Sequence, residues 1–312
     1  MIISASRRTD IPTYYSDWFF NRIRDGFVCV RNPRNYHLIS KILLTPELVD
    51  GIVFWTKNPV PMLGRLHELD GKYMYYFQFT VTSYDNDVET NMPSKRDVII
   101  PTFKKLSGMI GADRFIWRYD PILLTPKYNV QYHLKYFSEI AKQLSGYTKK
   151  CIISFVDLYK TTLRNTGNLD LIHVEPYHMH QLAKVLADVA QSYNIKVESC
   201  SEKIDLEQFG IAHGHCIDCQ LFEKLLGYKL KLDKDRNQRE ECGCVSSIDI
   251  GMYNTCKNGC KYCYASYNRS IVAKNYAMHD VNSPLISGNL LPDDVVKVLK
   301  TKSIKNYQQS IF

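Results

Sequence analysis

Short apolar segments alternate with longer amphipathic ones along most of the chain. Six apolar segments, rich in Ile, Val, Phe, Tyr and Trp, span residues 2–6, 51–56, 73–81, 114–119, 151–156 and 195–200. Nearly continuous apolar runs of this length are typical of parallel strands buried on both faces. Helical spacing of apolar residues occurs between them, at 15–24, 94–109, 132–144 and 176–192. This alternation predicts βαβ crossovers and a parallel sheet.

A seventh strand is predicted over residues 247–252, late in the chain. We therefore expect an α/β fold, a parallel (β/α) barrel of six to eight strands, which is common for 312 residues. Residues 1–205 would supply most of the barrel units and residues 206–246 a cysteine-rich insertion. Residues 247–312 would supply the last strand, a cysteine loop and a tail with one helix over 292–300, where Pro292 suits the first turn.

Three cysteines follow the seventh predicted strand at short spacing. Cys256, Cys260 and Cys263 lie on a loop in which Asn258-Gly259 permits a tight reversal, and Tyr262 precedes the last thiol. Four thiolates would complete a zinc site or saturate an iron–sulfur cluster, whereas three leave one iron of a 4Fe–4S cube free. The alternatives are half of a zinc site, or cysteines that bind no metal.

This C-x3-C-x-Tyr-C pattern resembles the cluster loop of the radical S-adenosylmethionine (SAM) superfamily. The resemblance implies that the thiolates hold a 4Fe–4S cluster whose open iron binds SAM. It also implies that a flavodoxin or ferredoxin supplies one electron, which cleaves SAM to methionine and a 5′-deoxyadenosyl radical that abstracts hydrogen from a substrate. In that superfamily the loop usually follows the first barrel strand. Its late position here predicts a circularly permuted TIM-like barrel, the alternative being a ferredoxin-like appendage on an unrelated barrel.

Polar side chains follow the predicted strands, where parallel barrels place their reactive groups. Basic residues at these ends could bind the carboxylate of SAM or an anionic substrate, namely Arg7, Arg8, Lys57 and Arg118. Acidic residues could bind its amino group or ribose hydroxyls, namely Asp10, Asp120, Asp157 and Glu198. Tyr262 could lie near the adenine. For each residue alone, an ordinary loop salt bridge is an equal alternative.

A second group of cysteines precedes the seventh strand. Cys216 and Cys219 form a C-x2-C pair, and Cys242 and Cys244 form a C-x-C pair. Together they could hold an auxiliary iron–sulfur cluster or a structural zinc, because both accept four thiolates. Spare ligand candidates are Cys200, His213 and His215. The alternative is a set of buried cysteines without metal.

Composition limits the class of protein. Hydrophobic residues make up 45% of the chain and charged residues 23%, as in ordinary globular proteins. No apolar run reaches the length of a membrane span and the start of the chain lacks a signal-peptide layout, so we expect a cytoplasmic protein without membrane contact. Seven of the ten cysteines crowd between residues 216 and 263, which in such a chain indicates metal ligation rather than disulfides.

The net charge of +8 is compatible with a phosphate-bearing partner such as nucleic acid. It leaves a second function open, that of a non-catalytic zinc or iron–sulfur barrel protein that binds nucleic acid or a protein partner. A mildly positive solvated surface would also explain the charge.

Four short segments of the chain form a distinctive set: residues 6–12 (Ser-Arg-Arg-Thr-Asp-Ile-Pro), 54–59 (Phe-Trp-Thr-Lys-Asn-Pro), 118–121 (Arg-Tyr-Asp-Pro) and 237–239 (Asn-Gln-Arg). With the terminal cysteine loop, they resemble an uncharacterised bacterial family of unknown function. Members of that family carry a C-terminal cysteine cluster similar to the N-terminal one of radical SAM enzymes. The resemblance spans nearly the full chain and implies no substrate.

Overall fold

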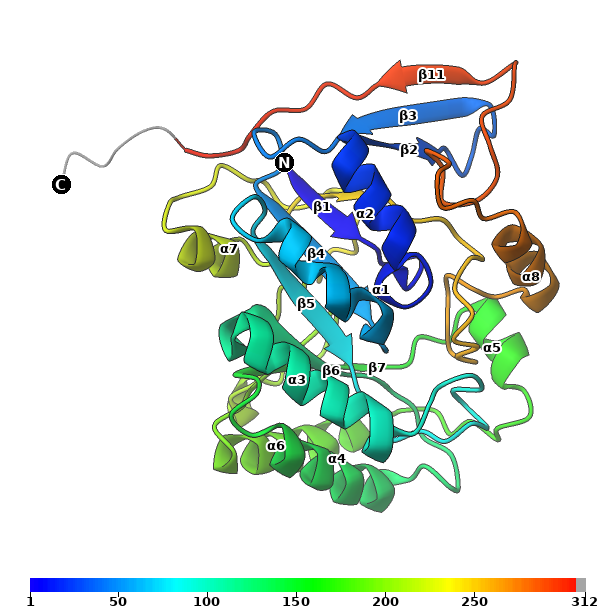
Figure 1. Ribbon diagram of the computed structural model, residues 1–312. Helices are drawn as coiled ribbons and strands as arrows, with labels where there is room; N and C mark the ends of the chain where they lie inside the picture. The colour runs from blue at the N-terminus through cyan, green and yellow to red at the C-terminus, as the bar shows by residue number, and fades with distance from the viewer. Residues whose placement is uncertain (307–312) are drawn as a thin grey trace.

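A parallel eight-stranded sheet forms the centre of the protein (Figure 1). The computed structural model describes residues 1–306. Every pairing in this sheet is parallel, which confirms the α/β class and the parallel sheet expected from the sequence. In spatial order its strands are β10 (Ile248–Asp249), β1 (Ile2–Ala5), β4 (Gly51–Thr56), β5 (Tyr75–Thr80), β6 (Phe115–Ile122), β7 (Lys150–Phe155), β8 (Lys196–Ser199) and β9 (Ala212–His213).

The edges of this sheet are β10 and β9. Within residues 1–306 no pairing joins these two strands, so the structure shows an open parallel sheet and no hydrogen-bonded closure into a barrel. Although β10 comes late in the chain, it pairs with β1, in the register Ile3 to Ile248 and Ser4 to Asp249. The loop that follows β10 therefore emerges next to the loop that follows β1.

Helices cover one face of the sheet and bury its larger hydrophobic cluster. Strand side chains such as Phe54, Phe77 and Trp117 pack there against apolar helix faces. The covering elements are α2 (Ser16–Asp25), η1 (Val60–Leu69), α3 (Ile100–Ile110), α4 (Val130–Leu144) and α6 (Pro176–Ser192). Apart from η1, these confirm the four predicted helices; the second begins as a π-helical segment, η2 (Lys95–Ile99), that continues directly into α3. Pro101 lies in the first turn of α3, directly after η2.

The cysteine-rich insertion covers part of the opposite face. Side chains near the amino ends of the strands, including Val53 and Tyr76, pack against Ile217, Phe222 and Leu230. Phe222 belongs to α7 (Cys219–Leu226) and lies so close to β4 that a Cβ on Gly51 would be 2.1 Å from its ring. Gly51 therefore leaves room for this ring. The insertion packs against this face near the amino ends of the strands, and its residues 237–244 reach the carboxyl ends.

A separate three-stranded sheet lies beside the main one (Figure 1). It consists of β2 (Phe27–Arg31), β3 (Leu38–Leu43) and β11 (Val295–Val298), in the order β11-β3-β2. The helix predicted over residues 292–300 is wrong, because this segment forms β11 and pairs in parallel with β3. Three of its four residues are valines, whose branched side chains favour strands, and β3 offers an open edge.

The remaining elements are short: α1 (Ile11–Tyr14), η3 (Ala112–Arg114), α5 (Lys160–Thr166), η4 (Glu207–Phe209) and α8 (Arg269–Ala277). Among the helices of residues 1–306, none is both long and apolar enough to cross a membrane.

Candidate functional site

A cavity of about 440 Å³ lies over the carboxyl ends of the parallel strands. Its walls come from the carboxyl-terminal parts of β4, β5, β6 and β7, from the residues that follow β1, β4, β7 and β8, from residues 237–244 and from the cysteine loop after β10. Open parallel sheets bind ligands at this edge. The volume lies within the range of small-molecule sites.

Most of the residues predicted for the site line this cavity. The predicted cofactor-binding residues found there are Arg7, Arg8, Asp10, Lys57, Arg118, Asp120, Asp157 and Tyr262. The predicted metal ligands found there are Cys216, Cys242, Cys244, Cys256, Cys260 and Cys263. Parallel-strand geometry explains this, because the carboxyl ends of neighbouring strands meet at one edge.

Two predicted residues lie elsewhere. The carboxylate of Glu198 is 2.9 Å from Lys150 Nζ and 3.0 Å from Lys196 Nζ. Both lysines begin strands, so Glu198 is held toward the amino end of the sheet, away from the cavity. Cys219 begins α7, where its Sγ lies 4.0 Å from the carboxylate of Glu223.

Cys256, Cys260 and Cys263, here called the cysteine trio, come from one tight loop. The Cys263 N–H donates to the Cys260 carbonyl at 3.1 Å. Gly259 has a φ of 69°, and a Cβ there would lie 3.2 Å from the side chains of Thr90 and Asn91, so both conformation and close approach favour glycine. Burial raises the pKa of all three thiols, that of Cys260 to about 12. Such thiols ionise readily only against a strong positive charge, which a metal centre supplies.

Asp10 joins the trio loop to the main sheet. Its buried carboxylate accepts hydrogen bonds from Thr13 N at 3.1 Å, Lys57 N at 2.8 Å and Asn258 Nδ2 at 3.0 Å. Asn258 Oδ1 in turn accepts from the Tyr14 hydroxyl at 2.9 Å. Three loops, those after β1, β4 and β10, are thereby fixed to one carboxylate. Asp10 is a positioning residue of the cysteine loop.

Glu89 is the main site residue that the sequence did not indicate. Its side chain is 1% exposed, and its carboxylate lies 2.7 Å from Lys57 Nζ, 3.0 Å from Lys95 Nζ and within hydrogen-bonding contact of the Tyr262 hydroxyl. Burial raises the pKa of Glu89, but the two ammonium groups outweigh burial and lower it to about 2. A β-bridge also pairs Glu89 with Cys260. Glu89 therefore holds Lys57 and Tyr262 beside the trio.

Arg118 lies over another part of the cavity wall. Its guanidinium donates to Asp120 at 3.0 Å, to Gln78 Oε1 at 3.3 Å and to Cys216 Sγ at 2.8 Å. The same group lies 5.3 Å from the centre of the Trp55 ring. Arg118 and Asp120, both predicted to contact SAM, are thus each other's partners, and Arg118 faces a thiol of the second cysteine group.

Among the other charged residues of the cavity, Asp157 pairs closely with Arg239, at 2.9 Å, whereas Arg7 and Arg8 have looser partners. Arg7 Nη2 lies 3.7 Å from Asp235, and Arg8 lies 4.0 Å from Asp249 and over the Tyr253 ring. At such distances a guanidinium keeps free N–H groups that can turn toward an anionic ligand.

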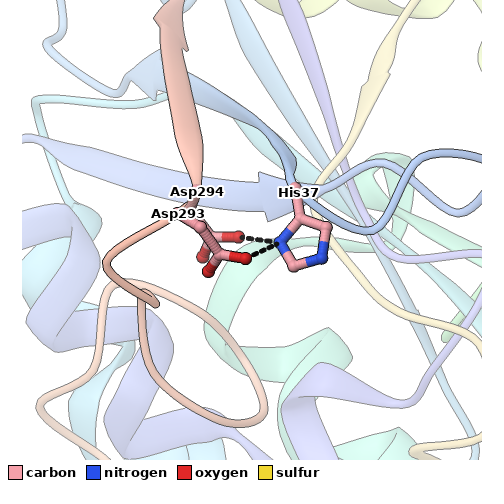
Figure 2. Close-up of side chains that lie close together, drawn as sticks. All are labelled: His37, Asp293 and Asp294. Carbon is pink, nitrogen blue, oxygen red and sulfur yellow. Dashed lines mark ion pairs between the residues drawn. The ribbon is translucent and has the colours of Figure 1, made fainter.

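A group of ligand-type side chains outside the cavity is formed by His37, Asp293 and Asp294 (Figure 2). His37 Nδ1 lies 3.2 Å from Asp293 and 3.5 Å from Asp294. Asp294 is already neutralised by Arg31, which makes two bonds of 2.7 and 2.9 Å to its carboxylate. The three residues lie where β11 begins, and Val295 N donates to the His37 carbonyl at 2.7 Å. This group fastens β11 to β3.

The fold and the cavity define a class of α/β protein in which a parallel sheet carries a cysteine-lined site at its carboxyl edge. The chain belongs to the DUF1848 family, whose model, described as a domain of unknown function, matches residues 2–265. This match runs from β1 through the last cysteine of the trio. No curated protein was found to match the chain.

Proposed function

We propose that this DUF1848 protein is a radical SAM enzyme whose cysteine trio holds a 4Fe–4S cluster. One observation carries the proposal. The three thiols come from a single loop after a sheet strand, and they line a cavity built from the carboxyl ends of the other strands. Three thiolates leave one iron of the cube for SAM, and the cavity has the volume of a small-molecule site.

The residues around the trio fit a cluster of this kind. A cube held by three thiolates carries negative charge, and Lys57 is placed so that its positive charge acts on both Cys260 and Cys263. When bound, the cluster and SAM would supply a 5′-deoxyadenosyl radical for hydrogen abstraction, with a flavodoxin or ferredoxin as electron donor. Arg7 and Arg8 would bind the SAM carboxylate or an anionic substrate. Asp10 and Glu89 would hold the loop and Lys57 in position.

Strand order supports a permuted relative of the radical SAM barrel. Starting from β10, the sheet runs β10-β1-β4-β5-β6-β7-β8-β9, so the cysteine loop follows the spatially first strand. The superfamily arrangement that the cysteine pattern resembles has the loop in this place. A circular permutation accounts for both facts, with the sheet as an open partial barrel.

Anaerobic reconstitution tests this function. The purified chain is supplied with iron and sulfide, reduced with dithionite and mixed with SAM. We expect the trio to account for about four irons, a paramagnetic signal that SAM perturbs, and release of 5′-deoxyadenosine, measured by mass spectrometry.

A matched pair of variants identifies the source of this activity. The triple variant Cys256→Ala/Cys260→Ala/Cys263→Ala should lose the SAM-perturbed signal and the 5′-deoxyadenosine. Cys29→Ala, a buried thiol of β2 outside the cavity, should retain both. A colourless zinc protein that ignores SAM, or an unchanged yield from the triple variant, would reject the proposal.

A further inference from the structure

The structure assigns a second metal centre to Cys200, Cys216, Cys242 and Cys244, here called the cysteine quartet. All four residues line the same cavity as the trio. Cys200 follows β8, near one edge of the main sheet, whereas the trio follows β10 at the other edge. The two cysteine groups therefore bound one cavity from different sides. This inference concerns other residues than the proposed SAM site and does not depend on it.

The quartet thiols form a continuous row. The Sγ atoms of Cys200 and Cys216 are 3.2 Å apart. The Cys244 thiol is in hydrogen-bonding contact with the thiols of both Cys216 and Cys242. Three of these cysteines are 5% exposed or less, so the row is shielded from water on most sides. Four thiols gathered in this way form the ligand set of a thiophilic metal.

Cys219 is excluded from this set by the helix that it begins. The carboxylate of Asp218 caps α7 by accepting from Leu221 N at 3.1 Å, and this fixes the direction in which the chain leaves Cys216. The Cys219 thiol consequently lies beside Glu223. Cys200, 16 residues before Cys216, takes the place that the C-x2-C spacing had suggested for Cys219.

Two N–H donors point at quartet sulfurs. The Arg118 guanidinium donates to Cys216 Sγ at 2.8 Å, and the Ile217 backbone N–H donates to Cys244 Sγ at 3.4 Å. Arg118 is 6% exposed, and its positive charge would offset the negative charge of a four-thiolate centre. Donors of this kind orient and stabilise thiolate ligands in metal sites.

The spacing of the row distinguishes between kinds of metal centre. Sulfurs about 2.3 Å from one tetrahedral zinc lie roughly 3.8 Å from each other. Within residues 1–306, no three of the quartet sulfurs lie within 4.8 Å of one another. A two-iron cluster, in which neighbouring thiolates share one iron and the two pairs bind different irons, suits this open row better than a single ion does. We therefore expect iron and sulfide at the quartet.

The test uses the full chain with the trio removed, so that its outcome is separate from that of the proposed function. Cys256→Ala/Cys260→Ala/Cys263→Ala is purified anaerobically and its iron, sulfide and zinc are measured per chain. We expect this triple variant to retain bound metal. Adding Cys200→Ala/Cys242→Ala should remove it, whereas adding Cys219→Ala should leave the metal content within about a tenth of the triple variant. If zinc is found instead of iron, the result supports the metal site but changes the metal assigned to it.

A second measurement uses the unaltered chain, so it does not depend on whether the variants fold. Cysteines are alkylated before and after treatment with a chelator and counted by peptide mass spectrometry. The chelator should increase labelling of the quartet several-fold and leave Cys219 and Cys29 unchanged. The proposal is overturned if the triple variant binds no metal, if Cys219→Ala removes it, or if Cys200 and Cys216 are recovered as a disulfide.

Discussion

Glu89 illustrates how a single carboxylate can organise a site without belonging to a motif. Replacing it with glutamine removes the counter-charge of Lys57 and Lys95, whose side chains are only 12% and 22% exposed. Breaking a buried ion pair from one side leaves an uncompensated charge, so we expect Glu89→Gln to lower the free energy of unfolding by about 3 kcal/mol. Urea denaturation measures this change. Glu139→Gln, an exposed position in α4, should change it by less than about 0.5 kcal/mol. Equal effects would contradict the role of Glu89.

His133 gives the stability a dependence on pH. Its buried ring lies between the Tyr119 hydroxyl and the Leu123 carbonyl, each at 2.9 Å, and burial lowers its pKa to about 4. The folded state therefore holds the neutral ring, while the unfolded chain takes up a proton near the ordinary pKa of about 6.5. Stability from this residue is complete above pH 6.5 and is lost as the pH falls toward 4.

Between pH 7.5 and pH 5 this residue should cost about 2 kcal/mol of unfolding free energy. His133→Gln, which does not titrate, should lack that part of the loss, although the variant starts from a lower stability. Urea denaturation of both proteins at the two pH values gives the difference. A variant whose stability falls as steeply as that of the parent chain would show that His133 is not the titrating group.

At the level of single residues, sequence reasoning could place side chains at the carboxyl edge of the sheet but not name their partners. Asp10 and Arg118 line the cavity as expected, because strand ends fix position. Their contacts depend on loops that meet only in the folded chain. Glu198 lies level with Arg118 across the sheet, but its carboxylate pairs with Lys150 and Lys196 and does not face the cavity. Glu89 comes from an ordinary polar loop, and no spacing or composition marked it.

At the level of elements, the cysteine-rich insertion packs on the sheet face opposite the covering helices. This packing depends on the close contact between Phe222 and Gly51. A Cβ at Gly51 would overlap the Phe222 ring, so we expect Gly51→Ala to lower the free energy of unfolding by about 2 kcal/mol. Phe222→Leu should recover about 1 kcal/mol in the Gly51→Ala background, because the two residues are coupled. Gly64→Ala has no atom within 4 Å of the new Cβ and should be nearly neutral. Additive effects in thermal or urea unfolding would rule out this contact.

Elements with a strong local pattern were predictable and those defined by distant partners were not. The strand over 51–56 and the helix over 176–192 agree with β4 and α6 at both ends, since apolar runs and helical spacing are local properties. The segment 292–300 carries a proline suited to a helix start, yet its valines pair with β3, more than 250 residues earlier. The residues around 292–300 alone do not reveal that the segment pairs with β3. The same holds for Cys200, which meets Cys216 because each follows one of two strands, β8 and β9, that pair in the sheet.

At the level of the whole molecule, the position of β10 beside β1 predicts that the chain tolerates a new starting point. The Lys302 carbonyl lies 3.0 Å from the Met1 nitrogen, so the last part of the chain that the structure describes runs beside its start and a flexible linker can join the two. A permuted chain that begins at Ser247 would place the cysteine loop after its first strand. We expect it to fold with the parent circular dichroism spectrum and to bind the same amount of iron. Its unfolding midpoint should be lower, because the linker removes the ion pair between the Met1 amine and Asp50.

A second permuted chain with the same linker provides the control. It opens between Trp117 and Arg118, in the middle of β6, which pairs with both β5 and β7. Splitting this strand breaks the buried ladder at the centre of the sheet, so this chain should be insoluble or unfolded. If the chain that begins at Ser247 fails in the same way, β10 and the cysteine loop fold correctly only when they stand at the end of the chain. The sheet would then be a distinct α/β arrangement that shares only its cysteine spacing with radical SAM enzymes, and the permuted-barrel interpretation would be withdrawn.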